Sequence, residues 1–183
     1  MERKSFVYSM TMIGLMAAVI CILGPLSIPV GLVPVSFTNL AIFFTIYILG
    51  TKKSVMSLLI YILIGLAGAP VFSGFSGGLA KLLGPTGGYI IGFIIMALIS
   101  GIFIDKFIDK WLLCIFGMIT GTLACYTLGT AWLAYQAKMT IPAAIGVGVL
   151  PFIPGDIVKI LVVSIMGPRI RKRLIKHNLF VQS

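Results

Sequence analysis

Long runs of apolar residues constrain this chain more than any other feature. Several of them follow one another, each about 15 to 26 residues long, and a transmembrane helix needs about 20 apolar residues to cross a hydrocarbon core roughly 30 Å thick. Of the 183 residues, 60% are hydrophobic and 10% are charged, which is too few charges for the surface of a soluble domain. We therefore expect an all-α integral membrane protein in which residues 1–183 form a single domain.

Six transmembrane helices fit these runs. We place them at residues 6–23, 36–49, 54–67, 88–104, 111–135 and 157–166. The second and third are short, at about 21 Å each, so we expect them to tilt or to lean on a neighbouring loop. The sixth is expected to stop before Gly167 and Pro168, because proline interrupts helices.

The basic residues predict the orientation. Of the 14 lysines and arginines, all but three fall on one side if six helices alternate. The eleven basic residues on the shared side are Arg3, Lys4, Lys52, Lys53, Lys106, Lys110, Arg169, Arg171, Lys172, Arg173 and Lys176. The positive-inside rule places this side, with both termini, in the cytoplasm of a cell-membrane protein. The net charge of +10 would then attract the anionic headgroups of the lipid bilayer, and its scatter over short loops does not favour nucleic-acid binding.

A glycine-rich segment, residues 68–88, separates the third and fourth predicted helices. Glycine permits positive φ and lets the backbone approach a ligand closely, and irregular backbone at membrane depth occurs only where protein or a cavity satisfies it. We expect this outer loop to fold over a ligand pocket. Residues 84–89 are either a turn and helix start, with Thr86 as the cap, or a source of backbone N–H groups for an anion. The glycines considered for this contact are Gly77, Gly78, Gly84 and Gly87.

The segment PFIPGDIVK, residues 151–159, places two charges in the outer half of the chain. Asp156 stands where a helix N-cap belongs, and Lys159 lies three residues on, on nearly the same face. One interpretation is a cap with a local ion pair. The other is a ligand site, because a charge near the bilayer centre costs about 2.5–3.5 kcal/mol and usually faces a cavity. Aspartate accepts from ligand N–H groups, and lysine donates to a carbonyl or carboxylate.

Other candidate ligand residues leave two interpretations open. Lys81 either reaches the outer headgroups or contacts the ligand. Asn39 and Gln136 lie in apolar spans, where an amide needs a partner, which is either another helix or the ligand. Four aromatic residues either line an apolar pocket or serve only in packing: Phe37, Phe75, Tyr89 and Tyr135.

Several catalytic motifs do not occur in the sequence. It contains no GxxxxGK[ST] phosphate loop, no HExxH and no GxSxG, and its single histidine is in the basic tail. We therefore expect neither an ATPase site nor another enzyme activity. The three cysteines show no CxxC spacing, so we expect no metal and no cofactor.

Three segments resemble the BioY family, the biotin-binding S components of energy-coupling-factor (ECF) vitamin transporters. They are VPVSFTNLAIFF at 33–44, GAPVFSGFSGGLAKLLGPTGGY at 68–89 and PFIPGDIVK at 151–159. The resemblance implies six transmembrane helices with both termini in the cytoplasm, biotin bound beneath outer loops, and uptake driven by a transmembrane scaffold subunit with two ABC-type ATPases. It also implies that Gly14 and Ala18 dock on the scaffold, with glycine where alanine is more usual.

The chemistry of biotin suits the candidate residues. Its ureido ring carries two N–H donors and a carbonyl, which match Asp156, Lys159 and Asn39. Its carboxylate suits the N–H groups of the glycine-rich segment, or Lys81. Two alternatives stay open: an S component for another small vitamin such as thiamin, or a structural membrane protein that binds no ligand.

Overall fold

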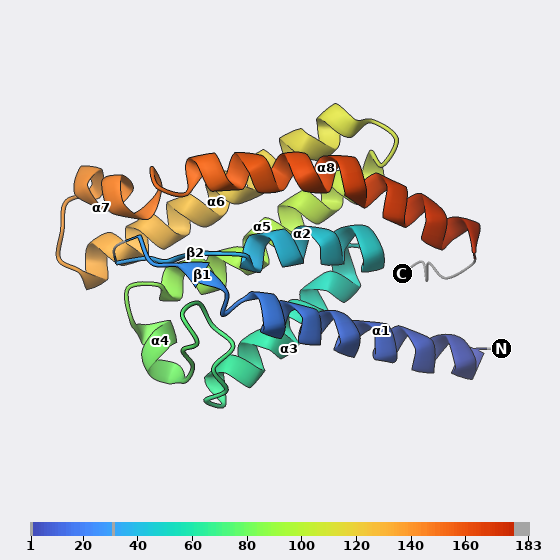
Figure 1. The fold of residues 1–183 in the computed structure, drawn as a ribbon, viewed down its shortest axis with the longest axis horizontal. Coiled ribbons are helices and arrows are strands. Elements are labelled where there is room, and N and C mark those ends of the chain that lie inside the picture. The colour runs from blue at the N-terminus through green and yellow to red at the C-terminus, as the bar shows by residue number, and fades with distance from the viewer. Residues whose placement is uncertain (1, 31, 178–183) are drawn as a thin grey trace.

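The computed structural model describes residues 2–30 and 32–177. Helices form at all six ranges that the apolar runs predict, and they pack into one elongated bundle (Figure 1). These helices are α1 (Glu2–Leu23), α2 (Thr38–Leu49), α3 (Thr51–Leu66), α5 (Gly87–Lys106), α6 (Trp111–Gln136) and α8 (Ile153–Lys176). The short helices α4 (Leu79–Leu83) and α7 (Ile141–Gly148) lie in the connections.

Three of the helices in the described part of the chain are long and apolar enough to cross a membrane. They are Phe6–Leu23 of α1, α5 and α6. The pair α7 and α8, which is bent by 51°, passes the same test when it is counted as one broken span. Helix α2 is apolar but has only 12 residues. The protein is therefore mostly helical and of the membrane type.

The helices begin and end near the predicted positions, with one clear exception. The prediction that the last helix stops before Gly167 is wrong, because α8 runs through Pro168 to Lys176. A proline removes only one helical hydrogen bond. Packing on both sides of it holds the helix together: a Cβ on Gly167 would overlap the ring of Tyr47 in α2, and Arg171 pairs with Asp105 at the end of α5.

Helices α5 and α6 pack closely along most of their length. Small residues make this possible, since a Cβ on Gly117 would overlap Phe103 and one on Gly121 would overlap the Ser100 hydroxyl. Farther along, a Cβ on Gly129 would overlap the ring of Tyr89. This close crossing fixes the direction in which Tyr89 and its neighbours on α6 point.

One end of the bundle carries the irregular structure. The ends of α1 and α8 that are nearest the chain termini lie at the opposite end (Figure 1). Two short strands, β1 (Ser27–Ile28) and β2 (Val35–Ser36), pair antiparallel, with Ser27 opposite Ser36. We call the segment from β1 to β2 the β-ribbon. It lies beside the glycine-rich segment, where the Gly74 N–H donates to the Pro25 carbonyl over 3.1 Å.

The glycine-rich segment is folded rather than extended. Phe72 is fully buried and meets the ring of Tyr61 edge-on, with 5.5 Å between the centroids. The Gly78 N–H donates to the Gly65 carbonyl at the end of α3 over 2.7 Å. Gly74 and Gly78 have φ angles of 74° and 84°, the left-handed region that glycine tolerates best.

Candidate functional site

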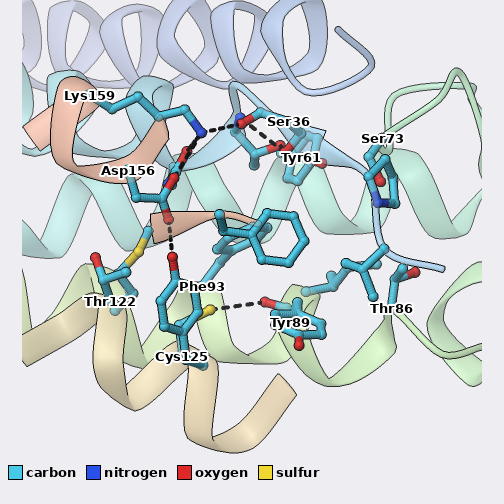
Figure 2. A pocket seen from close by; sticks show the side chains of 18 residues that line it. Ser36, Tyr61, Ser73, Thr86, Tyr89, Phe93, Thr122, Cys125, Asp156 and Lys159 are labelled. Carbon is cyan, nitrogen blue, oxygen red and sulfur yellow. Dashed lines mark hydrogen bonds and ion pairs between the residues drawn. The ribbon is translucent and has the colours of Figure 1, made fainter. Parts of the chain in front are cut away.

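A cavity opens at the end of the bundle that carries the β-ribbon (Figure 2). Its walls come from the β-ribbon, α2, α3, α5, α6 and α8, and the glycine-rich segment adds Ser73 and Thr86. Apolar side chains that include Phe93, Met96 and Phe152 form one part of the lining. A few polar groups in a mostly apolar hollow are typical of a small-molecule site.

The polar part of the lining centres on Asp156. Its Oδ1 atom accepts a hydrogen bond from Asn39 Nδ2 at 2.7 Å and one from Lys159 Nζ at 2.9 Å. Its Oδ2 atom accepts from the Tyr126 hydroxyl at 2.6 Å. Helices α2, α6 and α8 therefore meet at one carboxylate, which faces the cavity in Figure 2.

Lys159 joins the same carboxylate to the β-ribbon. Besides Asp156, its ammonium group donates to the Ser36 carbonyl at 2.7 Å and to Asn39 Oδ1 at 3.0 Å. It also lies 5.8 Å from the centre of the Phe37 ring, within cation–π range. We call Ser36, Asn39, Tyr126, Asp156 and Lys159 the pocket cluster.

The charged pair of the pocket cluster is buried, and the cluster has no net formal charge. Asp156 is 7% exposed and Lys159 is 8% exposed. Two charges removed from water are tolerated when they pair and when further hydrogen bonds satisfy their remaining valences. The cluster meets this condition, and it presents both acceptors and donors to whatever fills the cavity.

The predicted N-cap role of Asp156 is wrong. Helix α8 begins at Ile153, and Phe152 takes the cap position, so Asp156 lies inside the first turn. The helix starts earlier because Pro154 lies in its first two residues, where the missing N–H costs nothing. The predicted ion pair with Lys159 does form, and the Asp156 side chain is directed to the cavity instead of to its own backbone.

Five of the predicted ligand residues line the cavity together. They are Asn39, Thr86, Tyr89, Asp156 and Lys159. The Tyr89 hydroxyl donates to the Gly148 carbonyl over 2.8 Å, and its ring lies 6.4 Å from that of Phe152. Thr86 stands at the cap position of α5, but its hydroxyl makes no capping bond. The contact of each of these residues with a ligand stays a prediction.

The other predicted ligand residues do not line the cavity. They are Phe37, Phe75, Gly77, Gly78, Lys81, Gly84, Gly87, Tyr135 and Gln136. Phe75 is 67% exposed and Tyr135 is 79% exposed, both on the outside of the protein. Lys81 is half-buried in α4, where burial lowers the pKa of its ammonium group.

The glycines of this segment serve the local fold. A Cβ on Gly77 would overlap the Ala69 carbonyl, and one on Gly87 would overlap the Leu82 carbonyl. The Gly87 N–H already donates to the Gly84 carbonyl at 3.0 Å. The Gly84 carbonyl accepts from Trp132 Nε1, and Gln136 Nε2 donates to the Leu83 carbonyl. These bonds attach α4 to α6, so Gln136 has a structural partner.

The BioY family model matches residues 1–176. The chain belongs to the BioY family. This confirms the resemblance seen in the three sequence segments.

Relatives within the BioY family match almost end to end. The chain is 33% identical to the biotin transporter BioY2 of Lactococcus lactis subsp. cremoris over 176 residues, which cover 96% of this chain and 97% of that protein. It is 34% identical to the biotin transporter BioY of Thermotoga maritima, covering 87% and 93%. A crystal structure of the S-component for biotin from an ECF-type ABC transporter matches with a TM-score of 0.86, 30% identity and coverage of 94% and 95%. The fold is thus that of an ECF S component.

Sequence reasoning missed several lining residues of this BioY protein. Tyr126 is the most important, because its hydroxyl binds Asp156 directly. The available signal was a hydroxyl group in the middle of a long apolar helix, where a polar atom needs a partner. Other lining residues that were not predicted include Ser36, Thr38, Tyr61, Phe93, Thr122, Cys125 and Phe152.

Proposed function

We propose that this protein is the high-affinity biotin-binding subunit of an ATP-driven vitamin uptake transporter in the cell membrane. The observation that carries the proposal is the buried pocket cluster beside an apolar cavity, in a chain of the BioY family. Biotin is the transported ligand, and no cofactor or metal is part of the proposal. The names of the relatives, which are biotin transporters, support the choice of ligand.

Biotin matches the lining of the cavity group by group. A ureido N–H would donate to Asp156, and the ureido carbonyl would accept from the second amide hydrogen of Asn39, a side chain that Lys159 holds in place. The fused sulfur ring would lie against Phe93 and Phe152. A few satisfied polar groups in an apolar pocket support a nanomolar Kd, which corresponds to a binding free energy of roughly −12 kcal/mol.

The proposed topology is a single membrane domain, residues 1–183, with six crossings and both termini in the cytoplasm. The ends of α1 and α8 nearest the termini lie at the same end of the bundle (Figure 1), as this topology requires. Helices α2 and α3, with 12 and 16 residues, reach only about 18 and 24 Å, so the β-ribbon and the glycine-rich segment would complete these crossings. The cavity would then open to the outside, beneath those two segments.

The proposed partners are an ECF transmembrane scaffold subunit and two ABC-type ATPases, since the chain has no phosphate loop of its own. The proposed docking face is the side of α1 that carries Gly14 and Ala18. Both residues are exposed, and a Cβ on Gly14 would meet nothing within 4 Å. Such a face lets a second helix approach closely.

The ligand proposal is tested by mass spectrometry of the small molecules that co-purify with the protein. The protein is then freed of ligand, and biotin or thiamin is added. Calorimetry gives the affinity for each vitamin, and thermal unfolding gives the stabilisation that each one causes. We expect biotin to bind and to stabilise the fold by about 4 kcal/mol at a thousandfold excess over its Kd. Binding of thiamin instead would support the S component for another vitamin, and the absence of any stabilising small molecule would support a structural role.

The docking proposal is tested by Gly14→Trp and Ala18→Trp. We expect either change to abolish biotin uptake by the assembled transporter, because a large side chain separates the helices, while calorimetry on the isolated subunit gives the wild-type affinity. Thr127→Trp is the matched control, since Thr127 is exposed on α6, a helix outside the proposed docking face. Normal uptake by the Gly14 and Ala18 variants would contradict the docking face.

A further inference from the structure

The hydrogen bonds of the Asp156 carboxylate are unevenly divided between its two oxygens. Oδ1 accepts from both Asn39 and Lys159, whereas Oδ2 accepts from the Tyr126 hydroxyl among the described residues. A carboxylate offers about four lone-pair sites, two on each oxygen. The protein therefore fills Oδ1 and leaves one acceptor position on Oδ2, beside the Tyr126 hydroxyl.

The donors of Lys159 are used in a different way. Its ammonium group has three hydrogens, and the structure gives them three acceptors: Ser36 carbonyl, Asn39 Oδ1 and Asp156 Oδ1. Lys159 and Asn39 thus hold the Oδ1 side of the carboxylate in place. Tyr126 anchors the other oxygen, so all three donors together set the rotation of the carboxylate about its last bond, and only Tyr126 acts on the oxygen that carries the open position.

Tyr126 is itself well held. Its side chain is half-buried on α6, and its ring lies 6.4 Å from that of Phe152 at an angle of 36°. The ring of Phe152 in turn meets Tyr89. A hydrogen bond from a hydroxyl to a carboxylate is short and about twice as strong as one between neutral groups, and its length of 2.6 Å agrees with this.

We propose that Tyr126 is a positioning residue for ligand recognition, an inference that rests on the proposed biotin function. Its hydroxyl orients Asp156 so that the remaining lone pair of Oδ2 faces the cavity and accepts one ureido N–H. Without the hydroxyl, the carboxylate turns more freely, and Oδ2 must take a second donor from water or lose a bond. Tyr126 acts through Asp156, so its effect on binding depends on that carboxylate.

A double-mutant cycle measured by calorimetry tests this dependence. The four proteins are wild type, Tyr126→Phe, Asp156→Asn and the double variant, each titrated with biotin. We expect Tyr126→Phe to raise the Kd about tenfold in the wild-type background, as for a lost bond to a charged group. In the D156N background, the same change should raise the Kd by less than about twofold.

Tyr89→Phe is the matched control. It removes another tyrosine hydroxyl from the same cavity, and that hydroxyl bonds to the Gly148 carbonyl and not to Asp156. Its effect on the Kd should be the same in both backgrounds. If Tyr126→Phe does not fold, 3-fluorotyrosine at position 126 keeps the hydroxyl as a stronger donor, and the change in Kd that it causes should disappear in the D156N background.

The outcomes separate this inference from the proposed function. Equal losses from Tyr126→Phe in both backgrounds, or no loss in either, would overturn the positioning role. The positioning role would also be overturned if 3-fluorotyrosine at position 126 changed the Kd equally in the wild-type and D156N backgrounds. A wild-type protein that does not bind biotin would overturn the proposed function instead, before any variant is compared.

Discussion

Helix α8 is tied to its neighbours by two polar clusters, and the contrast between them separates the proposed binding site from a structural contact. The pocket cluster surrounds Asp156 in the first turn of the helix. The second cluster, which we call the Asp105 cluster, joins Asp105, Arg171 and Thr51. Residues 156 and 171 are about 22 Å apart along the helix axis, so the clusters lie at opposite ends of the bundle.

The Asp105 cluster uses its acceptors to join protein segments. Asp105 Oδ1 accepts from Arg171 at 2.6 Å, and Oδ2 accepts from the backbone N–H and hydroxyl of Thr51 at 2.8 and 2.5 Å. Thr51 is the first residue of α3, and N–H groups at a helix start have no partner within the helix. The Asp105 side chain therefore acts as a cap from another helix.

The two carboxylates differ in their surroundings. The side chain of Asp105 is 32% exposed, whereas that of Asp156 is 10% exposed. Asp156 borders the cavity, and Asp105 is not among its lining residues. An ion pair alone therefore does not mark a ligand site. Greater burial and a place beside the cavity are what set Asp156 apart as the proposed ligand contact.

The largest expected difference between the clusters comes from Lys159→Ala and Arg171→Ala. Lys159→Ala removes one partner of a buried ion pair and leaves Asp156 as an uncompensated charge, which costs about 3–5 kcal/mol. We expect Lys159→Ala to raise the biotin Kd at least about 30-fold, because Asp156 then loses its position and its counter-ion.

Calorimetry and thermal unfolding of both variants measure this difference. Arg171→Ala should lower stability but change the Kd by no more than about twofold, as expected for a distant site. Equal losses of affinity in the two variants would show that the comparison is wrong and that both clusters serve binding.

A second, intermediate effect is expected from Gly129→Ala. A Cβ there would overlap the ring of Tyr89 and push it towards the cavity. Overpacking costs about 1–3 kcal/mol, so we expect lower thermal stability together with weaker biotin binding.

Gly146→Ala on α7 is the control for the glycine substitution. A Cβ at Gly146 would meet nothing within 4 Å, and replacing a helical glycine by alanine stabilises by up to about 1 kcal/mol. If Gly129→Ala unfolds at the wild-type temperature and binds biotin normally, the close packing of α5 and α6 does not shape the pocket.

The smallest effect is expected from Asp105→Asn. The amide oxygen still accepts from Thr51, and only the charge opposite Arg171 is lost. A partly exposed ion pair contributes up to about 1 kcal/mol, so the unfolding midpoint should fall by about 2–4 °C. The biotin Kd should not change. A tenfold weaker Kd would instead show that the two ends of α8 are coupled.

Much of the fold could be predicted because the apolar runs are local. A helix at each of the six runs follows from the length of the run, and the assignment to the BioY family follows from three segments that are each continuous in the sequence. Asn39, Asp156 and Lys159 were also predictable, since polar groups in apolar surroundings need partners. The expected site for the ligand carboxylate in the glycine-rich segment stays a prediction, and the steric role of Gly77 and Gly87 could be read only from the neighbouring backbone.

The sequence by itself determined that this is a helical membrane protein with a few polar residues set among apolar ones, because hydrophobicity and helix length are properties of short stretches. The tertiary structure decided which polar groups meet. Asn39 and Asp156 are 117 positions apart, and Tyr126 and Asp156 are 30 apart, so no local pattern links them. The continuation of α8 through Pro168 and the pairing of Asp105 with Arg171 also depend on contacts between distant helices. Such contacts form only when the helices pack, and packing decides which carboxylate is used for structure and which remains available to a ligand.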